Sequence, residues 1–320
     1  MKILLVGEAS AHRAQLERNL DQRYQIIDLP PEAAESTRFD DRIHEDDVVI
    51  SLRFTREKGA APAFRLLHVP GAGVDGVEVE NLSPTTTVCN VYEHEIPIAE
   101  YVLGCLLEWE IRATQLRLDF TDERWPELYR HRKPHGEIHG KTLGLIGYGR
   151  VGRAIADRAH AFGLQTIAVT GSQTSDEFVQ LLVPSRLDDL LEVSDYVVVA
   201  CPLTAQTRGM LDGRAFHRMK SSAILVNPSR AAIVEESALY EALSTGVIAG
   251  AFLDVWYSHP TGSSDRVKPS DFPLLDLPNT WCTPHSSAWT ENLFERRYAV
   301  IADNINRLMA GHALSNVVHY

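Results

Sequence analysis

The chain has 320 residues, of which 44% are hydrophobic and 23% are charged, and its formal net charge is -12. This length favours two domains that each bury a core. The negative charge argues against nucleic acids and anionic membranes as partners, because their phosphate groups would be repelled. No apolar run approaches the roughly 20 residues that a membrane-spanning helix needs. The four cysteines are far apart without a CxxC pair, so we expect a reduced, cytoplasmic protein with neither disulfide framework nor metal site.

The N-terminal part alternates short apolar runs with a helical pattern. Residues 1–8 contain one basic residue and a short apolar run, which favours a first buried strand over a signal peptide. Further strands are predicted at 48–52 and 66–69, and residues 11–20 have helical spacing. This alternation is typical of a parallel sheet with helices on both faces.

The middle of the chain departs from this alternation. A helical pattern over 98–118 predicts one long helix that bridges two domains. Residues 119–139 are rich in charge, histidine and proline, which predicts a projecting arm or linker. His131, His135 and His139 resemble a metal cluster only in composition, and we interpret them as part of a solvated arm.

After Gly140 the alternation of strands and helices resumes. Strands are predicted at 143–146, 166–169, 196–200, 223–226 and 248–253, and helices at 151–162, 235–243 and 291–309. The sequence therefore predicts an alternating unit, a bridging helix, a second alternating unit and a closing helix.

A glycine-rich loop joins the first strand of the second unit to the helix that follows it. It consists of Gly147, Tyr148, Gly149, Arg150, Val151 and Gly152. Gly147 permits a tight turn, Gly149 lets the backbone approach a diphosphate, and Gly152 lets the helix pack closely on the strand. The helix N-terminus offers N–H groups to an anion. This context predicts that the loop binds the pyrophosphate of a nicotinamide dinucleotide.

The end of the next strand bears on which dinucleotide is bound. NAD enzymes place an acid there for the ribose hydroxyls, whereas this chain has Thr170. No Lys or Arg follows until Arg186, so a strong clamp for a 2′-phosphate is also missing. Thr170 and Ser172 can hydrogen-bond either cofactor. We expect NAD or NADP, with a slight preference for NADP or dual use.

Six motifs in order resemble the D-isomer-specific 2-hydroxyacid dehydrogenase family. This family includes glyoxylate/hydroxypyruvate reductases, phosphoglycerate dehydrogenase and, more distantly, formate dehydrogenase. The motifs are VPGAGVDG at 69–76, IAE at 98–100, CPLT at 201–204 with Thr207, NPSR at 227–230, LDV at 253–255 and TPH at 283–285. The resemblance covers nearly the whole chain.

The resemblance implies a fold and an assembly. A Rossmann-type NAD(P)-binding domain, residues 106–290, would be inserted in a flavodoxin-like substrate domain, residues 1–105 with 291–320. Both would be doubly wound parallel-sheet α/β domains, with the active site in the cleft between them. The family also implies a homodimer, for which the long helix and the arm around Trp125 are suitable.

Two residues match the chemistry of 2-oxo acid reduction, which needs a cation for the carboxylate and a proton donor for the carbonyl oxygen. The planar guanidinium of Arg230 binds a carboxylate in a bidentate manner. His285 exchanges a proton near neutral pH. The resemblance further implies that the backbone N–H groups of Ala72, Gly73 and Val74 hold the substrate carboxylate.

The resemblance also implies cofactor contacts along the second unit. Cys201, Pro202 and Thr207 would lie beside the adenosine. Asp254 would approach the nicotinamide end, although it can instead simply cap the end of a strand.

His259 occupies the position where the family has a glutamate that raises the pKa of the catalytic histidine. A neutral His259 could orient His285, whereas a protonated one would lower its pKa. One interpretation is an active reductase with a His285–His259 pair and a pH optimum displaced downward. A second is an enzyme for an unusual substrate that needs less proton transfer, since formate dehydrogenase also lacks the glutamate.

A third interpretation is a weakly active or inactive cofactor-binding protein, as in the transcriptional corepressors that share the fold. A fourth is that another acid, Glu235, Glu236 or Asp265, reaches the site. We favour the first, because Arg230 and His285 are both present. The sequence thus predicts an oxidoreductase that transfers hydride between NAD(P) and a small 2-oxo or 2-hydroxy acid of glyoxylate or hydroxypyruvate size or somewhat larger. The alternative is an NAD(P)-binding sensor without turnover.

Overall fold

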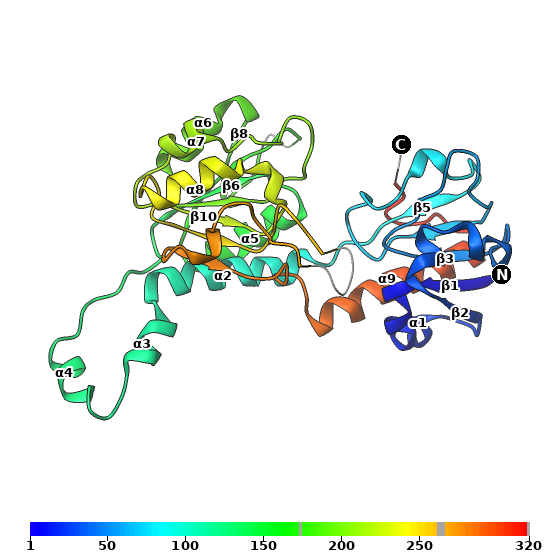
Figure 1. The fold of residues 1–320 in the computed structure, drawn as a ribbon, viewed down its shortest axis with the longest axis horizontal. Helices are drawn as coiled ribbons and strands as arrows, with labels where there is room; N and C mark the ends of the chain where they lie inside the picture. Colours follow the sequence, from blue (N-terminus) through cyan, green and yellow to red (C-terminus); the bar gives the residue numbers. More distant parts are fainter. Residues whose placement is uncertain (173–174, 261–265, 319–320) are drawn as a thin grey trace. The chain divides into compact units, whose positions relative to one another are not determined.

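The computed structural model describes residues 1–172, 175–260 and 266–318, so Asp265 lies outside the described residues. The chain divides into two compact units (Figure 1). Unit 1 comprises Met1–Glu93 and Thr290–Tyr320, and unit 2 comprises His94–Trp289. Unit 2 is therefore inserted in the sequence of unit 1.

Unit 1 contains a five-stranded parallel sheet with the order β2-β1-β3-β4-β5. The strands are β1 (Lys2–Val6), β2 (Gln25–Leu29), β3 (Val48–Ile50), β4 (Leu66–His68) and β5 (Thr87–Cys89). This is the flavodoxin-like order, as predicted. The central strands are buried on both faces, which explains their continuous apolar sequences.

Two helices cover one face of this sheet. They are α1 (Arg13–Asn19), preceded by a 3-10 turn at Gly7–His12, and α9 (Glu291–Ala310). The two helices pack against each other, and α9 buries Tyr298 and Ile301 against the sheet. Thr290 caps α9 by accepting a hydrogen bond from the N–H of Leu293, and Gly311 ends it with a φ of +71°. The predicted closing helix is therefore present.

Unit 2 contains a seven-stranded parallel sheet with the order β12-β11-β10-β9-β6-β7-β8. The strands are β6 (Thr142–Ile146), β7 (Gln165–Val169), β8 (Val179–Leu182), β9 (Tyr196–Val199), β10 (Ile224–Asn227), β11 (Gly250–Leu253) and β12 (Thr280–Cys282). Numbered within the unit, this is the Rossmann order 3-2-1-4-5-6 with one more strand.

Helices cover both faces of the unit 2 sheet (Figure 1). One face bears α2 (Glu95–Ile111) and α5 (Arg150–Ala161), which pack against each other. The other bears α6 (Leu187–Val193), α7 (Gly213–Arg218) and α8 (Glu236–Ser244). The prediction of two parallel-sheet α/β units is confirmed. None of the helices in the described ranges is long and apolar enough to cross a membrane.

The prediction of one helix over 98–118 is wrong. The helix α2 ends at Ile111. The next residue, Arg112, has a left-handed φ of 54°, and α3 (Ala113–Asp119) follows as a separate helix. The apolar periodicity continues past Arg112, but Leu116 is 53% exposed and contributes to no core. Periodicity alone could not show that the helix runs past the edge of its unit.

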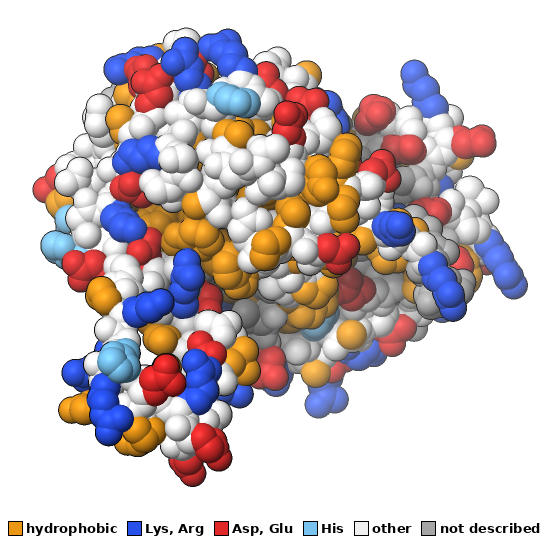
Figure 2. Space-filling view, turned by 60° about the vertical axis from the view of Figure 1, so that its left-hand side comes forward, with side chains coloured by type: hydrophobic (Ala, Val, Ile, Leu, Met, Phe, Trp, Pro, Cys, Tyr) orange, Lys and Arg blue, Asp and Glu red, His pale blue; other side chains and the backbone are white. Residues whose placement is uncertain are grey.

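Residues beyond α2 form an arm that projects from the body of unit 2 and carries the short helix α4 (Trp125–Arg130) (Figure 1). His131, His135 and His139 are exposed on it or at its base. Charged and hydrophobic side chains are mixed on the arm (Figure 2).

The boundary between the units differs from the proposed domain boundary at 105/106. The structure keeps α2 in one piece within unit 2, where its apolar face packs on α5. The second boundary lies at 289/290, one residue from the predicted position.

Candidate active site

The site residues predicted for unit 2 all follow the carboxyl ends of strands in one sheet. In the register, Ile146 at the end of β6 lies beside Val169 and Val199, and Leu253 lies between Asn227 and Cys282. The segments that continue these strands therefore emerge at one edge of the sheet. This edge is where open parallel α/β sheets bind their ligands.

The glycine loop has the geometry that a diphosphate requires. Gly147 has a φ of +107°, and a Cβ there would lie 2.7 Å from the backbone of Ala200. A Cβ on Gly152 would collide with the carbonyl oxygen of Gly147, whereas one on Gly149 would meet nothing within 4 Å. The backbone is thus packed where the loop meets its own unit and open at Gly149, where α5 begins. These residues fit a pyrophosphate at the helix N-terminus.

The side chain of Tyr148 is part of the fold of unit 2. Its ring is 4% exposed, and its hydroxyl donates a hydrogen bond to Asp176 (2.9 Å). Burial, reinforced by Asp176, raises the pKa of Tyr148 to about 12. Tyr148 therefore fixes the loop through its side chain, while its predicted cofactor contact would be made by the backbone. Arg150 is exposed at the start of α5, and Val151 is half-buried.

The end of β7 carries no carboxylate. Thr170 is buried there, and its N–H donates to the carbonyl of Leu182 at the end of β8. The neighbouring Ser172 is exposed, and its N–H donates to Oγ1 of Thr170 (3.4 Å). Because β8 runs parallel to β7, the turn Pro184–Arg186 emerges at the same edge. The fold thereby brings Arg186 to the edge that holds Thr170, which their spacing in the sequence did not reveal.

The predicted adenosine-side segment follows β9 and is stabilised by its own hydroxyl groups. Thr207 Oγ1 donates to the carbonyl of Pro202 (2.8 Å) and accepts from the N–H of Thr204 (2.8 Å). The carbonyl of Cys201 accepts from Ser229 Oγ (2.6 Å), which ties this segment to the loop after β10.

Asp254 anchors the loop that carries His285. It follows β11 directly, is fully buried, and accepts hydrogen bonds from Thr283 Oγ1 (2.5 Å) and the N–H groups of Ser286 and Ser287 (both 2.8 Å). Tyr101 of α2 bonds the same Thr283 hydroxyl (2.8 Å). These four polar partners were not predicted, and Tyr101 is distant in sequence. The predicted approach of Asp254 to the nicotinamide stays a prediction.

His285 projects from this loop with a left-handed backbone (φ 58°), which is uncommon for a non-glycine residue. The residue is exposed as a whole, but neighbouring atoms partly desolvate its ring, and this desolvation is the main cause that lowers its pKa. Asp254 raises this pKa, whereas Arg230 and His259 lower it. The rings of His285 and His259 are tilted, with centroids 6.0 Å apart, and among the described residues no hydrogen bond joins them. The structure therefore brings Arg230, Asp254, His259 and His285 into one electrostatic cluster.

Arg230 follows β10 and is exposed. Its Nη1 donates to the carbonyl of Ser229 (2.9 Å), and Nδ2 of Asn227 donates to the carbonyl of Arg230 (3.1 Å). Asn227 is 2% exposed, so the backbone that carries Arg230 is fixed by a buried amide.

A cavity of about 390 Å³ in unit 2 lies against the two histidines. Its lining comprises Trp256, Ser258, His259, Pro260, Val267, Pro269, Leu275, Cys282, Thr283, Pro284 and His285. Among the described residues, which leave out 261–265 and therefore Asp265, no acidic residue lines this cavity. Glu236 accepts instead from Ser270 Oγ and from the N–H of Asp271, and Glu235 accepts from Ser237.

The candidate carboxylate loop of unit 1 follows β4. Ala72 and Val74 are half-buried there, and Gly73 is exposed. The carbonyl of Ala72 accepts a hydrogen bond from Asn90 Nδ2 (2.8 Å), and that of Gly71 accepts one from the N–H of Val91 (3.1 Å). The structure thus ties this loop to the segment after β5.

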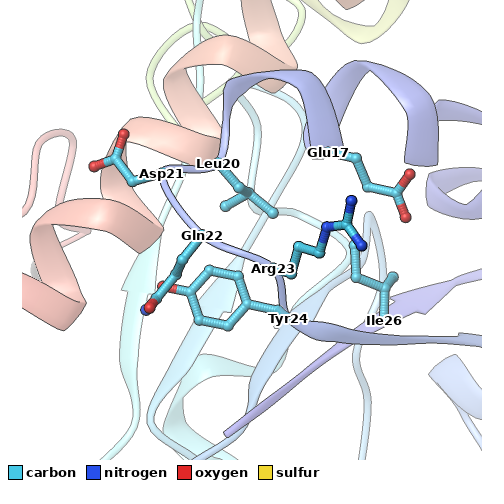
Figure 3. Close-up of a pocket in the computed structure, with 7 residues that line it drawn as sticks. All are labelled: Glu17, Leu20, Asp21, Gln22, Arg23, Tyr24 and Ile26. Atoms are coloured by element: carbon cyan, nitrogen blue, oxygen red, sulfur yellow. The ribbon is translucent and has the colours of Figure 1, made fainter.

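Another cavity, of about 500 Å³, lies in unit 1 (Figure 3). It is lined by the turn between α1 and β2, where Gln22 donates to the hydroxyl of Tyr24 (2.6 Å). This turn leads into the amino end of β2, opposite to the edge where parallel sheets bind ligands. It contains none of the predicted site residues.

Comparison with known proteins identifies the family. Residues 103–287 match the family described as D-isomer specific 2-hydroxyacid dehydrogenase, NAD binding domain. The chain belongs to this family. The predicted family and its class, the nicotinamide-dependent dehydrogenases, are thereby confirmed.

Curated relatives of this family align over most of the chain. A glyoxylate reductase of Korarchaeum cryptofilum is 32% identical over 81% of this chain and 77% of its own length. A glyoxylate/hydroxypyruvate reductase B of Salmonella newport is 32% identical over 81% and 79%. The D-3-phosphoglycerate dehydrogenase of Methanocaldococcus jannaschii is 31% identical over 87% of this chain, which spans only 53% of that enzyme.

Solved structures of this family share the fold. A D-isomer specific 2-hydroxyacid dehydrogenase from Lactobacillus delbrueckii ssp. bulgaricus, in its NAD complexed form, has a TM-score of 0.79 at 23% identity and full coverage of both chains. An NADPH-dependent glyoxylate/hydroxypyruvate reductase from Sinorhizobium meliloti, in complex with NADP and sulfate, has a TM-score of 0.75 at 23% identity, covering 99% of this chain and 98% of the other.

Proposed function

We propose that this protein reduces a small 2-oxo acid to a 2-hydroxy acid with a nicotinamide cofactor. The observation that supports this most strongly is the cluster of Arg230, Asp254 and His285 at the same sheet edge as the glycine loop. A carboxylate-binding cation, a proton donor and a dinucleotide-binding turn are the parts that this reaction requires. In this proposal unit 2 binds the cofactor and unit 1 contributes to substrate binding.

The residues of the chain divide the work between binding and proton transfer. The cofactor would supply the hydride that reaches C2 of the substrate. Arg230 binds and orients the substrate carboxylate through its guanidinium and polarises the carbonyl beside it. The imidazolium of His285 donates its proton to the carbonyl oxygen and regains one from solvent. Asp254 holds the loop so that the imidazole is positioned for this transfer.

The cluster also sets the pH range of the reaction. Reduction requires protonated His285, and partial desolvation of its ring lowers the pKa of this exposed residue below its ordinary value. The rate of reduction therefore declines at lower pH than it would with an unperturbed histidine. His259 contributes to this shift as a neighbouring cation when it is protonated.

We propose NADP as the preferred cofactor, with NAD as a usable second. Thr170 presents no carboxylate that would repel a 2′-phosphate, and Ser172 is exposed for hydrogen bonding. Arg186 at the same edge supplies a positive charge, although it already pairs with Asp189 (2.5 Å).

The arm supports the further proposal that the protein is a homodimer. Leu118, Phe120, Trp125 and Tyr129 are 49–67% exposed, and the last three form a chain of ring contacts with centroids 5.6 and 5.0 Å apart. Such apolar exposure on a projecting element is typical of an interface. All four cysteines are free, which suits the proposed reducing cytoplasm.

A nicotinamide assay tests the proposed function. The purified protein is mixed with NADPH or NADH and glyoxylate, hydroxypyruvate, pyruvate or a larger 2-oxo acid, and absorbance is followed across pH. We expect turnover with at least one acid and its loss when His285 is replaced by Gln. Cofactor binding without turnover at any pH would instead indicate the sensor alternative.

A further inference from the structure

Three successive carbonyl groups of the unit 1 loop are held from the inside of the unit. The carbonyl of Pro70 accepts from Arg297 Nη1 (3.2 Å), that of Gly71 from the N–H of Val91 (3.1 Å), and that of Ala72 from Asn90 Nδ2 (2.8 Å). Two of these three donors are side chains. The orientation of the loop therefore depends on residues outside it.

The fixed carbonyls determine where the N–H groups point. In a trans peptide unit the C=O of one residue and the N–H of the next point in opposite directions. Because the carbonyls of Pro70, Gly71 and Ala72 point into the unit, the N–H groups of Gly71, Ala72 and Gly73 point away from it. Within the described part of unit 1, none of these N–H groups donates to a protein acceptor. Successive outward N–H groups form an anion-binding concavity.

Arg297 links two loops of unit 1. It lies in the second turn of α9, and its Nε donates to the carbonyl of Tyr92 (3.0 Å) while its Nη1 holds Pro70. Tyr92 follows β5 and Pro70 follows β4. A guanidinium suits this task because its donors have a fixed planar geometry and its charge strengthens each hydrogen bond.

Asn90 provides the second side-chain anchor from a fixed position. It is 7% exposed, and its own N–H donates to the carbonyl of Asn316 (3.1 Å) in the C-terminal segment. Its side-chain amide is therefore held in place when it donates to Ala72.

We propose that Arg297 and Asn90 are positioning residues that orient the backbone of Gly71, Ala72 and Gly73 to bind a carboxylate. They act through the carbonyls of the loop and do not touch the substrate. This inference rests on the proposed function, because the carboxylate it concerns is that of the 2-oxo acid.

The test measures binding of oxamate, an unreactive isostere of a 2-oxo acid, to the full chain saturated with NADPH. The variants are Arg297→Met, Arg297→Lys and Asn90→Ala. Arg307→Met is the matched control for charge, because Arg307 also lies on α9 and pairs with Asp303. Asn81→Ala is the control for the amide, because Asn81 Nδ2 also donates to a backbone carbonyl of unit 1, that of Arg56 (2.8 Å).

We expect each of the three variants to raise the Kd of oxamate by about tenfold, the scale of one lost charge-assisted hydrogen bond. The Kd of NADPH and both controls should stay at the wild-type value. Arg297→Lys keeps the positive charge but loses the planar set of guanidinium donors. It therefore shows whether the hydrogen-bond geometry or the charge alone is required. If Arg297→Met does not fold, Arg297→Lys and Asn90→Ala decide the result.

Wild-type affinity for oxamate in Arg297→Lys or in Asn90→Ala would overturn the proposal, as would a wild-type protein that does not bind oxamate. The turnover assay is read separately. Weakened oxamate binding in the variants of a protein that reduces no 2-oxo acid would refute the proposed function, and only the role of Arg297 and Asn90 in carboxylate binding would remain. Turnover by the wild-type protein, together with unchanged oxamate binding in the variants, would support the proposed function and refute the positioning role of Arg297 and Asn90.

Discussion

Unit 1 and unit 2 each have a loop beyond the carboxyl edge of a parallel sheet. In unit 1 the loop is held through its carbonyl oxygens, whereas in unit 2 it is held through its N–H groups. In unit 1, donors on Arg297 and Asn90 bind carbonyl oxygens of the loop. In unit 2, the carboxylate of Asp254 binds the N–H groups of Ser286 and Ser287.

The difference shows how buried anchors determine what a loop offers to a ligand. When the protein binds the carbonyls, N–H groups face outward and the backbone itself suits an anion. When the protein binds the N–H groups, the hydrogen-bonding groups of the backbone are satisfied and a side chain is left to face the ligand, in our proposal the imidazole of His285. The proposed reaction uses both: a backbone that binds and a side chain that transfers a proton.

The largest effect is expected from Asp254→Ala. This change leaves Thr283 and the N–H groups of Ser286 and Ser287 without their shared acceptor, so the imidazole of His285 loses its position. We expect kcat to fall about a hundredfold, because displacements near 1 Å cost this much. Asp212→Asn is the control, since Asp212 also binds a backbone N–H in unit 2, that of Ala215 (2.8 Å). A kcat within a few-fold of wild type would refute the anchoring role.

A second prediction concerns His68, which directly precedes the candidate carboxylate loop of unit 1. His68 ends β4, is fully buried, and contacts Asn304 Nδ2 through Nε2 (3.0 Å). Burial lowers its pKa to about 4, so the folded state excludes a proton that the unfolded state binds below pH 6.5. Stability is therefore present above pH 6.5 and is lost as pH falls towards 4, by about 3 kcal/mol.

Hydrogen exchange of the β4 amides, corrected for intrinsic rates, measures this loss of stability in unit 1. Replacing His68 by Gln should flatten the pH dependence, while exchange in β10 of unit 2 stays unaffected. An equally steep dependence in the variant would show that another group is responsible.

A smaller effect is expected from Arg186→Ala. In our proposals, unit 1 binds the substrate carboxylate through backbone N–H groups, whereas unit 2 binds the 2′-phosphate of NADP through the side chain of Arg186. We expect kcat/KM with NADPH to fall about tenfold, as for the loss of one charge-assisted contact, and the value with NADH to stay the same. Arg214→Ala, which removes an exposed arginine paired with Asp188, is the control. Equal effects on both cofactors would exclude a role in selectivity.

The smallest effect is expected from His259→Glu. A carboxylate there favours the imidazolium of His285 and raises its pKa, so the protonated donor persists to higher pH. We expect reduction on the alkaline side of the profile to increase several-fold. His217→Glu makes the same charge change at an exposed position of unit 2 and should leave the profile unchanged. An unshifted profile in His259→Glu would show that His259 is too distant to act.

The sequence predicted the two parallel-sheet units because apolar runs are local patterns, and it located the residues after the strand ends through motifs that resemble those of the family. Apolar runs identified strands such as β6 and β10, and the motifs identified Gly147, Arg230 and His285. The strands β2, β5, β8 and β12 were not predicted. Each lies at an edge of its sheet and includes residues that are only partly buried, so their apolar patterns are short or interrupted. The break at Arg112 was missed because helical periodicity persists on the exposed arm.

The anchors of the two loops could not be predicted, because they depend on contacts between distant segments. Arg297 is 227 residues from Pro70 in sequence, and Tyr101 is 182 residues from Thr283. Arg186 is a candidate for binding the 2′-phosphate only because β8 returns the chain to the sheet edge at Thr170. In each case the residue type is ordinary, and only the tertiary structure gives it a partner.

The most direct test of this account compares Arg297→Met with Asp254→Ala in one set of experiments that measures kcat, KM for the best 2-oxo acid and the Kd of oxamate. If the two loops divide binding and proton transfer, Arg297→Met raises KM and the Kd of oxamate at nearly constant kcat. Asp254→Ala then lowers kcat at a nearly constant Kd of oxamate. A change of the same parameter in both variants would contradict this division between the two loops.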